Sequence, residues 1–303
     1  MKIGLIDADS HNFPNLCLMK ISAWHKSIGD EVEWWDGFAE YDRVYISRVF
    51  DDLYSPEPME PVNAKEIIRG GTGYDLKNVL PHEIEHMMPD YSIYHDKVPE
   101  TKYTAYGFLT RGCPRHCPFC IVGDKEGLVS RKVADLSEWW NGQKIIKLLD
   151  PNLLASKDHL DLIRQLADSK AKIDFTQGLD ARLLTEKNIE ALNQCNTKMI
   201  HFAWDMMEFS EQIIRGLAIY NKHGKIKDLR KRRVYLLTNY NTTMQENFYR
   251  IEKIQELGYE PYIMIYNKPN APDEVRYLQR FYNNAILSHS TTFQQYMESG
   301  HKR

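Results

Sequence analysis

Long apolar runs and a large excess of charge of one sign are both missing from this chain of 303 residues. No window approaches the length of a transmembrane helix, so we expect no contact with a membrane. The net charge of −3 gives no global attraction to nucleic acid or to an anionic membrane. The apolar stretch at residues 1–8 is too short for a signal peptide. We therefore expect a cytoplasmic globular protein, in a compartment where thiols stay reduced.

Cysteine is also scarce, yet three of the 5 cysteines stand together in the run Arg111-Gly112-Cys113-Pro114-Arg115-His116-Cys117-Pro118-Phe119-Cys120. With so few cysteines in the chain, chance is a poor explanation of this spacing. Pro114 and Pro118 oppose a continuous helix, which favours an irregular loop whose thiols converge. A four-iron cluster normally takes four thiolates, so a loop that offers three leaves one iron open to a small ligand.

The C-x-x-x-C-x-aromatic-C pattern resembles the signature of the radical S-adenosylmethionine (SAM) superfamily, and the resemblance extends over about residues 103–272. It implies a [4Fe–4S] cluster on Cys113, Cys117 and Cys120, with SAM chelating the fourth iron through its amino and carboxylate groups. It also implies an external one-electron donor of the flavodoxin or ferredoxin type. One electron passes into the sulfonium, and the resulting 5′-deoxyadenosyl radical removes a hydrogen atom from a substrate that the sequence does not reveal.

Alternating strand and helix segments predict an α/β fold with parallel strands. Residues 1–75 resemble the small Rossmann-like, B12-binding-like domains that precede the radical SAM barrel in several subfamilies, and residues 76–102 are expected to form a connector. Six β/α units over residues 103–287 predict an open, partial (β/α)6 TIM-like barrel. Its strands are expected at residues 103–110, 144–149, 173–176, 198–203, 233–237 and 261–266. The polar residues 288–303 predict a loosely held tail.

Barrel enzymes place their chemistry at the C-terminal ends of the strands, so polar residues there are candidates for SAM contacts. Asp150 and Asn152 follow the second predicted barrel strand, where the family keeps a segment, often Gly-Gly-Glu, that binds the SAM amino group. The sequence differs from Gly-Gly-Glu, but Asp150 can supply an acceptor for an ammonium group. Phe119 can cover the adenine of SAM or shield the cluster from water.

Further candidates follow the next three predicted strands. Arg182 is expected to pair with the SAM carboxylate, and Gln177 or Asp180 with the ribose hydroxyls. Asp205 and Asn239 occupy similar places after the fourth and fifth strands. A helix cap or a loop hydrogen bond is the alternative for each of these polar side chains, since Asp, Asn and Thr cap helices routinely.

A partial cobalamin motif lies near the N-terminus. Asp9-Ser10-His11-Asn12-Phe13-Pro14 partly matches Asp-x-His-x-x-Gly, in which a His ligates cobalt and an Asp supports it. Pro14 replaces the final Gly, and the domain is short for a corrin with its nucleotide tail. A cobalamin-dependent methyltransferase therefore stays an alternative to a vestigial domain. A methylthiotransferase would need three more cluster ligands, where the N-terminal domain offers only Cys17.

Zinc offers a different class of function. His116 or a distant His can complete a Cys₃His site, and the basic segment between Lys222 and Arg233 can contact phosphates. The same cysteines would then stabilise a nucleic-acid-binding module rather than an enzyme.

Four smaller features are assigned ordinary roles. His82-Glu83-Ile84-Glu85-His86 matches the H-E-x-x-H pattern of zinc proteases, but it lies between Pro81 and Pro89 and has no third His at the expected spacing. Gly70-Gly71-Thr72-Gly73 lacks the Lys of a P-loop and predicts a flexible link. Cys17 and Cys195 are expected to be small buried hydrophobic side chains.

Overall fold

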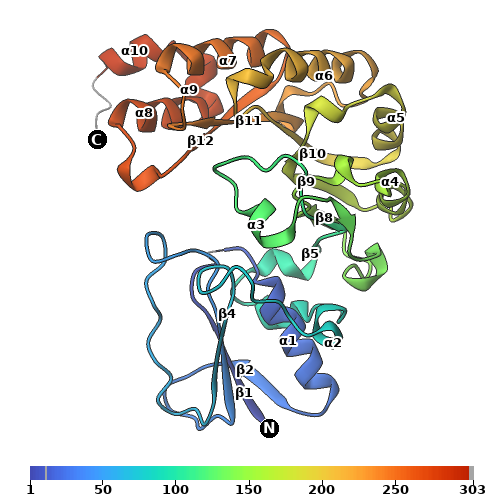
Figure 1. The fold of residues 1–303 in the computed structure, drawn as a ribbon, viewed down its shortest axis with the longest axis vertical. Helices are drawn as coiled ribbons and strands as arrows, with labels where there is room; N and C mark the ends of the chain where they lie inside the picture. The colour runs from blue at the N-terminus through green and yellow to red at the C-terminus, as the bar shows by residue number, and fades with distance from the viewer. Residues whose placement is uncertain (11, 300–303) are drawn as a thin grey trace.

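The computed structural model describes residues 1–10 and 12–299, and it builds two parallel sheets one after the other along the chain (Figure 1). The first sheet has four strands in the order β2-β1-β3-β4, and the second has six in the order β12-β11-β10-β9-β8-β5. Every neighbouring pair within these two sheets is parallel. The predicted α/β class with parallel strands is therefore confirmed.

The N-terminal sheet packs on one main helix. Ile3 and Leu5 of the central strand are buried against Leu18 and Ile21 of this helix. The helix begins at Asn15, whose side chain accepts a hydrogen bond from the N–H of Leu18. The elements are β1 (Lys2–Asp7), α1 (Leu16–Ser27), β2 (Glu31–Trp34), β3 (Arg43–Ser47) and β4 (Ile67–Gly70). The sequence analysis missed β4.

The C-terminal sheet follows the chain strictly, since its strands are neighbours in sequence order. Right-handed crossovers in one direction place the connecting helices on one face of the sheet, and Figure 1 shows α4 to α8 along its outer side. The two edge strands do not pair with each other, so the sheet is open. The strands are β5 (Thr104–Gly107), β8 (Ile145–Leu148), β9 (Lys172–Leu179), β10 (Asn196–Ala203), β11 (Arg232–Thr238) and β12 (Glu260–Ile265). The helices are α4 (His159–Asp168), α5 (Glu186–Gln194), α6 (Ser210–His223), α7 (Met244–Glu256) and α8 (Asp273–Tyr282).

The expected loose tail is wrong over most of its length. Two short helices, α9 (Ala285–Ser290) and α10 (Phe293–Glu298), continue the fold after α8. The Phe293 ring lies 5.5 Å from that of Phe281, and Tyr296 is buried. These two aromatic side chains hold the segment down, although the residues around them are polar.

The segment between the sheets is packed rather than free. It contains the short helix α2 (His82–Glu85) and a turn with two buried tyrosines. The Tyr91 hydroxyl donates to the carbonyl of Trp139 at 2.6 Å, and the Tyr94 hydroxyl donates to Asp7 at 2.5 Å. Because Trp139 belongs to the second half and Asp7 ends β1, this segment connects the two sheets.

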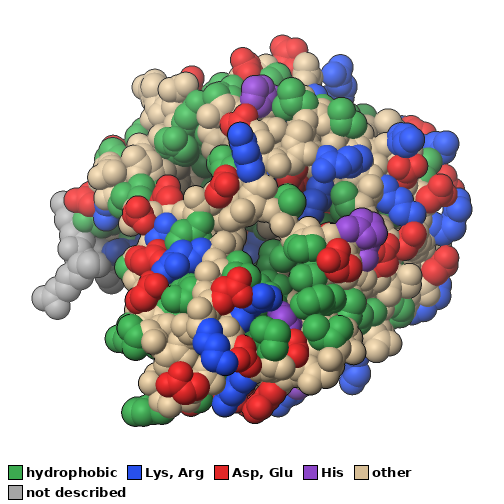
Figure 2. All heavy atoms as spheres, turned by 60° about the horizontal axis from the view of Figure 1, so that its bottom comes forward, with side chains coloured by type: hydrophobic (Ala, Val, Ile, Leu, Met, Phe, Trp, Pro, Cys, Tyr) green, Lys and Arg blue, Asp and Glu red, His purple; other side chains and the backbone are tan. Residues whose placement is uncertain are grey.

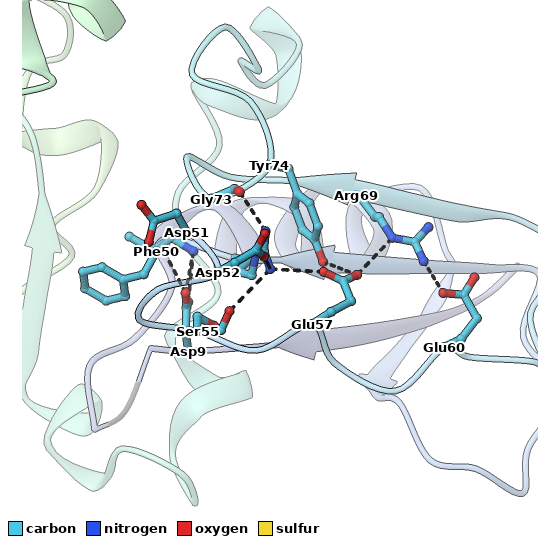
Figure 3. A network of polar contacts seen from close by, with 12 residues as sticks. Asp9, Phe50, Asp51, Asp52, Ser55, Glu57, Glu60, Arg69, Gly73 and Tyr74 are labelled. Carbon is cyan, nitrogen blue, oxygen red and sulfur yellow. Dashed lines mark hydrogen bonds and ion pairs between the residues drawn. The ribbon is translucent and has the colours of Figure 1, made fainter. Parts of the chain in front are cut away.

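The expectation of a flexible glycine link at residues 70–73 is also wrong. Arg48, just after β3, is buried and donates to the carbonyl of Gly73 at 2.9 Å and to Asp52 at 2.7 Å. Gly71 has φ +99°, and a Cβ there would lie 2.2 Å from the Arg48 carbonyl oxygen. Figure 3 shows the surrounding network, in which the Glu57 carboxylate lies between Tyr74 and Arg69. The glycines permit a tight turn against β3.

Within residues 1–10 and 12–299, no helix is both long enough and apolar enough to cross a lipid bilayer.

Candidate functional site

The three clustered cysteines lie in an irregular loop, residues 112–120, which we call the cysteine loop. It leaves β6 (Thr110–Arg111) and ends at the short helix α3 (Val122–Glu126). The loop is closed at its base, because β6 pairs antiparallel with β7 (Arg131–Lys132) and the Cys113 N–H donates to the Gly127 carbonyl at 3.1 Å. Gly112 has φ +88°, which suits glycine at this tight start.

The three thiols are half-buried and influence one another electrostatically. Burial raises the pKa of Cys117 to about 11, and Asp205 and the thiols of Cys120 and Cys113 add to the rise, against Arg182. Burial also raises the pKa of Cys120, and the Cys113 thiol acts in the same direction. Cys117 and Cys120 therefore keep their protons at neutral pH until a metal displaces them.

A single metal ion has no ready site in the described part of the chain, because no three His, Cys, Asp or Glu side chains there are grouped closely enough to hold one. The thiolates of a four-iron cluster bind different irons, so they stand farther apart than the ligands of one ion. His116, the candidate fourth zinc ligand, is 59% exposed and lies 3.7 Å from the Asp124 carboxylate. The structure does not bring His116 to the thiols.

Asn152 lies directly beside the cysteine loop. Its amide nitrogen donates to the Cys113 sulfur at 3.5 Å and to the Asp180 carboxylate at 3.4 Å. The side chain is buried, and its amide oxygen has no partner among the described residues. A buried acceptor of this kind is normally satisfied by a donor. The predicted candidate Asn152 thus presents an acceptor next to a thiol.

Asp150 faces the start of the cysteine loop instead of a ligand space. One carboxylate oxygen accepts the Leu109 N–H at 2.8 Å, and the other accepts the Thr110 N–H at 2.7 Å and its hydroxyl at 2.6 Å. These bonds replace strand pairing after Gly107, which is why the predicted strand at residues 103–110 breaks into β5 and β6. Asp150 therefore supports the start of the cysteine loop, and its role as an acceptor for the SAM ammonium stays a prediction.

The buried position of Asp150 predicts a measurable pH dependence of stability. Burial raises the pKa of this carboxyl from 3.8 to about 7, so the folded protein binds the proton more tightly than the unfolded chain. The proton on Asp150 stabilises the folded protein fully at pH values below the pKa that this carboxyl has in the unfolded chain. This stabilisation is lost as the pH rises through about 7. We expect the free energy of unfolding of the natural protein minus that of Asp150→Asn to fall between about pH 4 and pH 7 in urea titrations. A difference that does not change with pH would contradict this.

Two arginines share the carboxylate of Asp180. Arg115, from the cysteine loop, lies 2.6 Å from one oxygen of Asp180, and Arg182 lies 2.7 Å from the other. Burial opposes ionisation here, but pairing with Arg182 and Arg115 keeps the pKa of Asp180 below its usual value. Asp180 is therefore held beside the cysteine loop through Arg115, and its carboxylate is engaged by arginines. Contacts of Asp180 and Arg182 with SAM stay predictions. Arg115 was not predicted, because its place between two cysteines was its only signal.

Asp205 completes the polar surroundings of the thiols. It follows β10, and burial raises its pKa to about 6 against the attraction of Arg250 and Arg182. Arg250, from α7, is fully buried and donates to the carbonyls of Trp204 at 2.9 Å and Leu237 at 2.9 Å. These bonds tie the C-terminal ends of β10 and β11 together. Arg250 was not predicted from the sequence, because an arginine in a helix normally indicates a surface position.

An aromatic row reaches from the cysteine loop to the last two strands of the sheet. The Phe119 ring lies 5.2 Å from that of Tyr240, which lies 5.0 Å from that of Tyr266. Phe119 therefore lies at the edge of the site, as a covering side chain would. Asn239 has φ 62° and donates to the Tyr266 carbonyl at 2.8 Å, so it stabilises a turn. Gln177 is exposed within β9, which runs three residues beyond the predicted strand.

Polar side chains of the two N-terminal motifs support the fold. The Asp9 carboxylate accepts the N–H groups of Val49 and Phe50 at 2.7 to 3.0 Å, so it stabilises the chain after β3, as Figure 3 shows. His11, the predicted cobalt ligand, lies outside the described residues. His86 pairs with Glu138 at 2.6 Å, and its helix α2 has only four residues.

The predictions for the remaining single features have different outcomes. Cys195 is buried as predicted. Cys17 on α1 is accessible to solvent, although the protein around it is close enough to raise the pKa of this thiol by burial. The basic segment at residues 222–233 lies before β11, at the opposite end of that strand from Asn239. Much of its charge is used locally: Arg230 pairs with Asp228, and Arg232 donates to Asn221.

No protein-family model matches this chain, and no curated protein matches it. The cysteine motif and the geometry around it are therefore what indicate a function for this chain.

Proposed function

We propose that this protein is a radical SAM enzyme that holds a [4Fe–4S] cluster on Cys113, Cys117 and Cys120 and cleaves SAM reductively. The observation that carries the proposal is the buried amide oxygen of Asn152, which lacks a partner among the described residues and belongs to a side chain 3.5 Å from the Cys113 sulfur. A SAM molecule on the fourth iron would bring its ammonium group to this region. The ammonium is a donor that suits a buried amide oxygen.

The charges around the thiols also fit SAM. Arg115 and Arg182 bring two positive charges to the single carboxylate of Asp180. A guanidinium group of this cluster would stabilise the SAM carboxylate beside the cysteine loop. When bound, the cluster supplies one electron to the sulfonium, which yields methionine and a 5′-deoxyadenosyl radical that removes hydrogen from a substrate.

The arrangement of the sheet supports the same proposal. Six parallel strands in sequence order, with helices along one side, are what an open (β/α)6 barrel requires. Asn152, Asp180 and Asp205 all follow the C-terminal ends of its strands. The loops at this end are where such barrels carry their active sites.

The experiment is anaerobic reconstitution with iron and sulfide, followed by dithionite and SAM. We expect a brown protein with about four irons per chain that forms 5′-deoxyadenosine. Asn152→Ala should weaken SAM binding about tenfold or more, since it removes a hydrogen bond to a charged group. The control Asn270→Ala changes an exposed amide and should leave SAM binding unchanged.

Two results would count against the proposal. A fully loaded cluster that forms no 5′-deoxyadenosine would exclude reductive cleavage of SAM. A colourless protein with one zinc per chain would instead favour the zinc-stabilised module.

A further inference from the structure

Three apolar side chains are exposed beside the cysteine loop. Ile121, Leu128 and Val129 are 49%, 50% and 68% exposed, respectively. After the buried Ser130 come Arg131 and Lys132, the two residues of β7, and both are exposed. We call these five exposed residues the loop-flank patch. Apolar side chains rimmed by charged ones are typical of surfaces that bind other proteins.

The loop-flank patch contacts the backbone that carries the cysteines. Ile121 is the residue after Cys120, and the carbonyl of Gly127 accepts the Cys113 N–H at 3.1 Å. A Cβ on Gly112 would lie 2.2 Å from the Val129 carbonyl oxygen, so these two backbones touch. A partner protein bound to the patch would therefore be separated from the thiols of Cys113 and Cys120 by only a short stretch of backbone.

The charge of this region differs in sign from that of the whole chain. Residues 111–135 hold five basic and three acidic side chains, a net charge of +2 with His116 neutral, whereas the chain as a whole carries −3. Part of this positive charge is compensated, because Lys132 pairs with Asp135 at 2.6 Å and Arg111 with Glu126 at 2.7 Å. The Arg131 guanidinium donates to the backbone carbonyl of Glu126, which leaves its charge uncompensated by that contact. The face in Figure 2 carries basic and acidic side chains interspersed. The local charge favours an acidic partner.

We propose that the loop-flank patch is the docking surface for an acidic, low-potential one-electron donor protein of the flavodoxin type. The inference rests on the proposed function, because a reducible cluster is what requires such a donor. The anionic flavin hydroquinone loses one electron and becomes the neutral semiquinone, and the cluster gains that electron. Electron transfer slows steeply with distance, so a donor should dock where the least protein separates it from the thiolates.

The test compares two reductants on the reconstituted protein. The probe is an acidic flavodoxin in its hydroquinone form, with dithionite as the small reductant that needs no docking surface. Leu128→Glu/Val129→Glu and Arg131→Glu/Lys132→Glu should each lower the flavodoxin-driven rate of 5′-deoxyadenosine formation at least tenfold and weaken flavodoxin binding in calorimetry. The dithionite-driven rate should stay within twofold. The control Ile286→Glu alters an 81% exposed apolar residue on α9 and should change neither rate.

Two results would overturn the docking proposal. Equal losses with both reductants would mean that the variants damage the site itself, and unchanged flavodoxin binding would place the donor elsewhere. Failure of the proposed function looks different, because the natural protein would then form no 5′-deoxyadenosine with dithionite.

Discussion

Alanine at Cys113, Cys117 or Cys120, one position at a time, is expected to abolish 5′-deoxyadenosine formation. Each of these thiols is assigned to a different iron, so losing one leaves two irons open and the cluster unstable. Iron per chain after anaerobic reconstitution should fall well below the value of about four expected for the natural protein. Iron analysis and the visible absorption of the brown protein measure this directly.

The matched controls are the two cysteines outside the loop. Cys17 is exposed on α1, and Cys195 is buried with its sulfur 3.7 Å from the Ile163 carbonyl oxygen. Cys17→Ala and Cys195→Ala should both keep the iron and the SAM cleavage of the natural protein. A cluster that survives the loss of a loop cysteine, or that disappears with Cys17, would assign the ligands differently.

Arg250→Leu is expected to destabilise the fold by about 3 kcal/mol or more. The guanidinium is completely buried and donates to the carbonyls of Trp204, Asp205 and Leu237. Leucine fills much of the space but leaves these buried acceptors without donors, which costs free energy for each of them. Urea unfolding followed by circular dichroism measures the loss.

Arg215→Leu is the control, because it changes an exposed arginine of α6. Its effect should stay within about 0.5 kcal/mol. Arg250 ties β10 to β11 close to Asp205. The Arg250→Leu variant should therefore also bind SAM more weakly after reconstitution. Equal stability of the two leucine variants would show that the carbonyl contacts of Arg250 matter little.

The regular elements were largely predictable because their signal is local. All six strands of the C-terminal sheet lie where the sequence indicated, within a few residues at each end. The errors have identifiable causes. β4 is short and partly buried, so its apolar signal is weak, and α10 is held by Phe293 and Tyr296 inside a polar stretch.

The site was predictable in part. Asn152, Asp180, Arg182 and Asp205 follow strand ends, and the order of the strands alone brings them to one edge of the sheet. Their partners were not predictable. Asp150 turns toward the chain that starts the cysteine loop, and Arg115 reaches Asp180 across 65 positions of sequence.

The sequence by itself determined the parallel α/β class and the three thiols in one proline-rich loop, because strand periodicity and ligand spacing are written along the chain. Only the tertiary structure decided which polar groups are already satisfied. It occupies Asp150 and Asp180 with internal donors and leaves the Asn152 amide oxygen without one among the described residues. The physical reason is that a hydrogen bond depends on distance and direction between residues far apart in sequence, which no local pattern specifies.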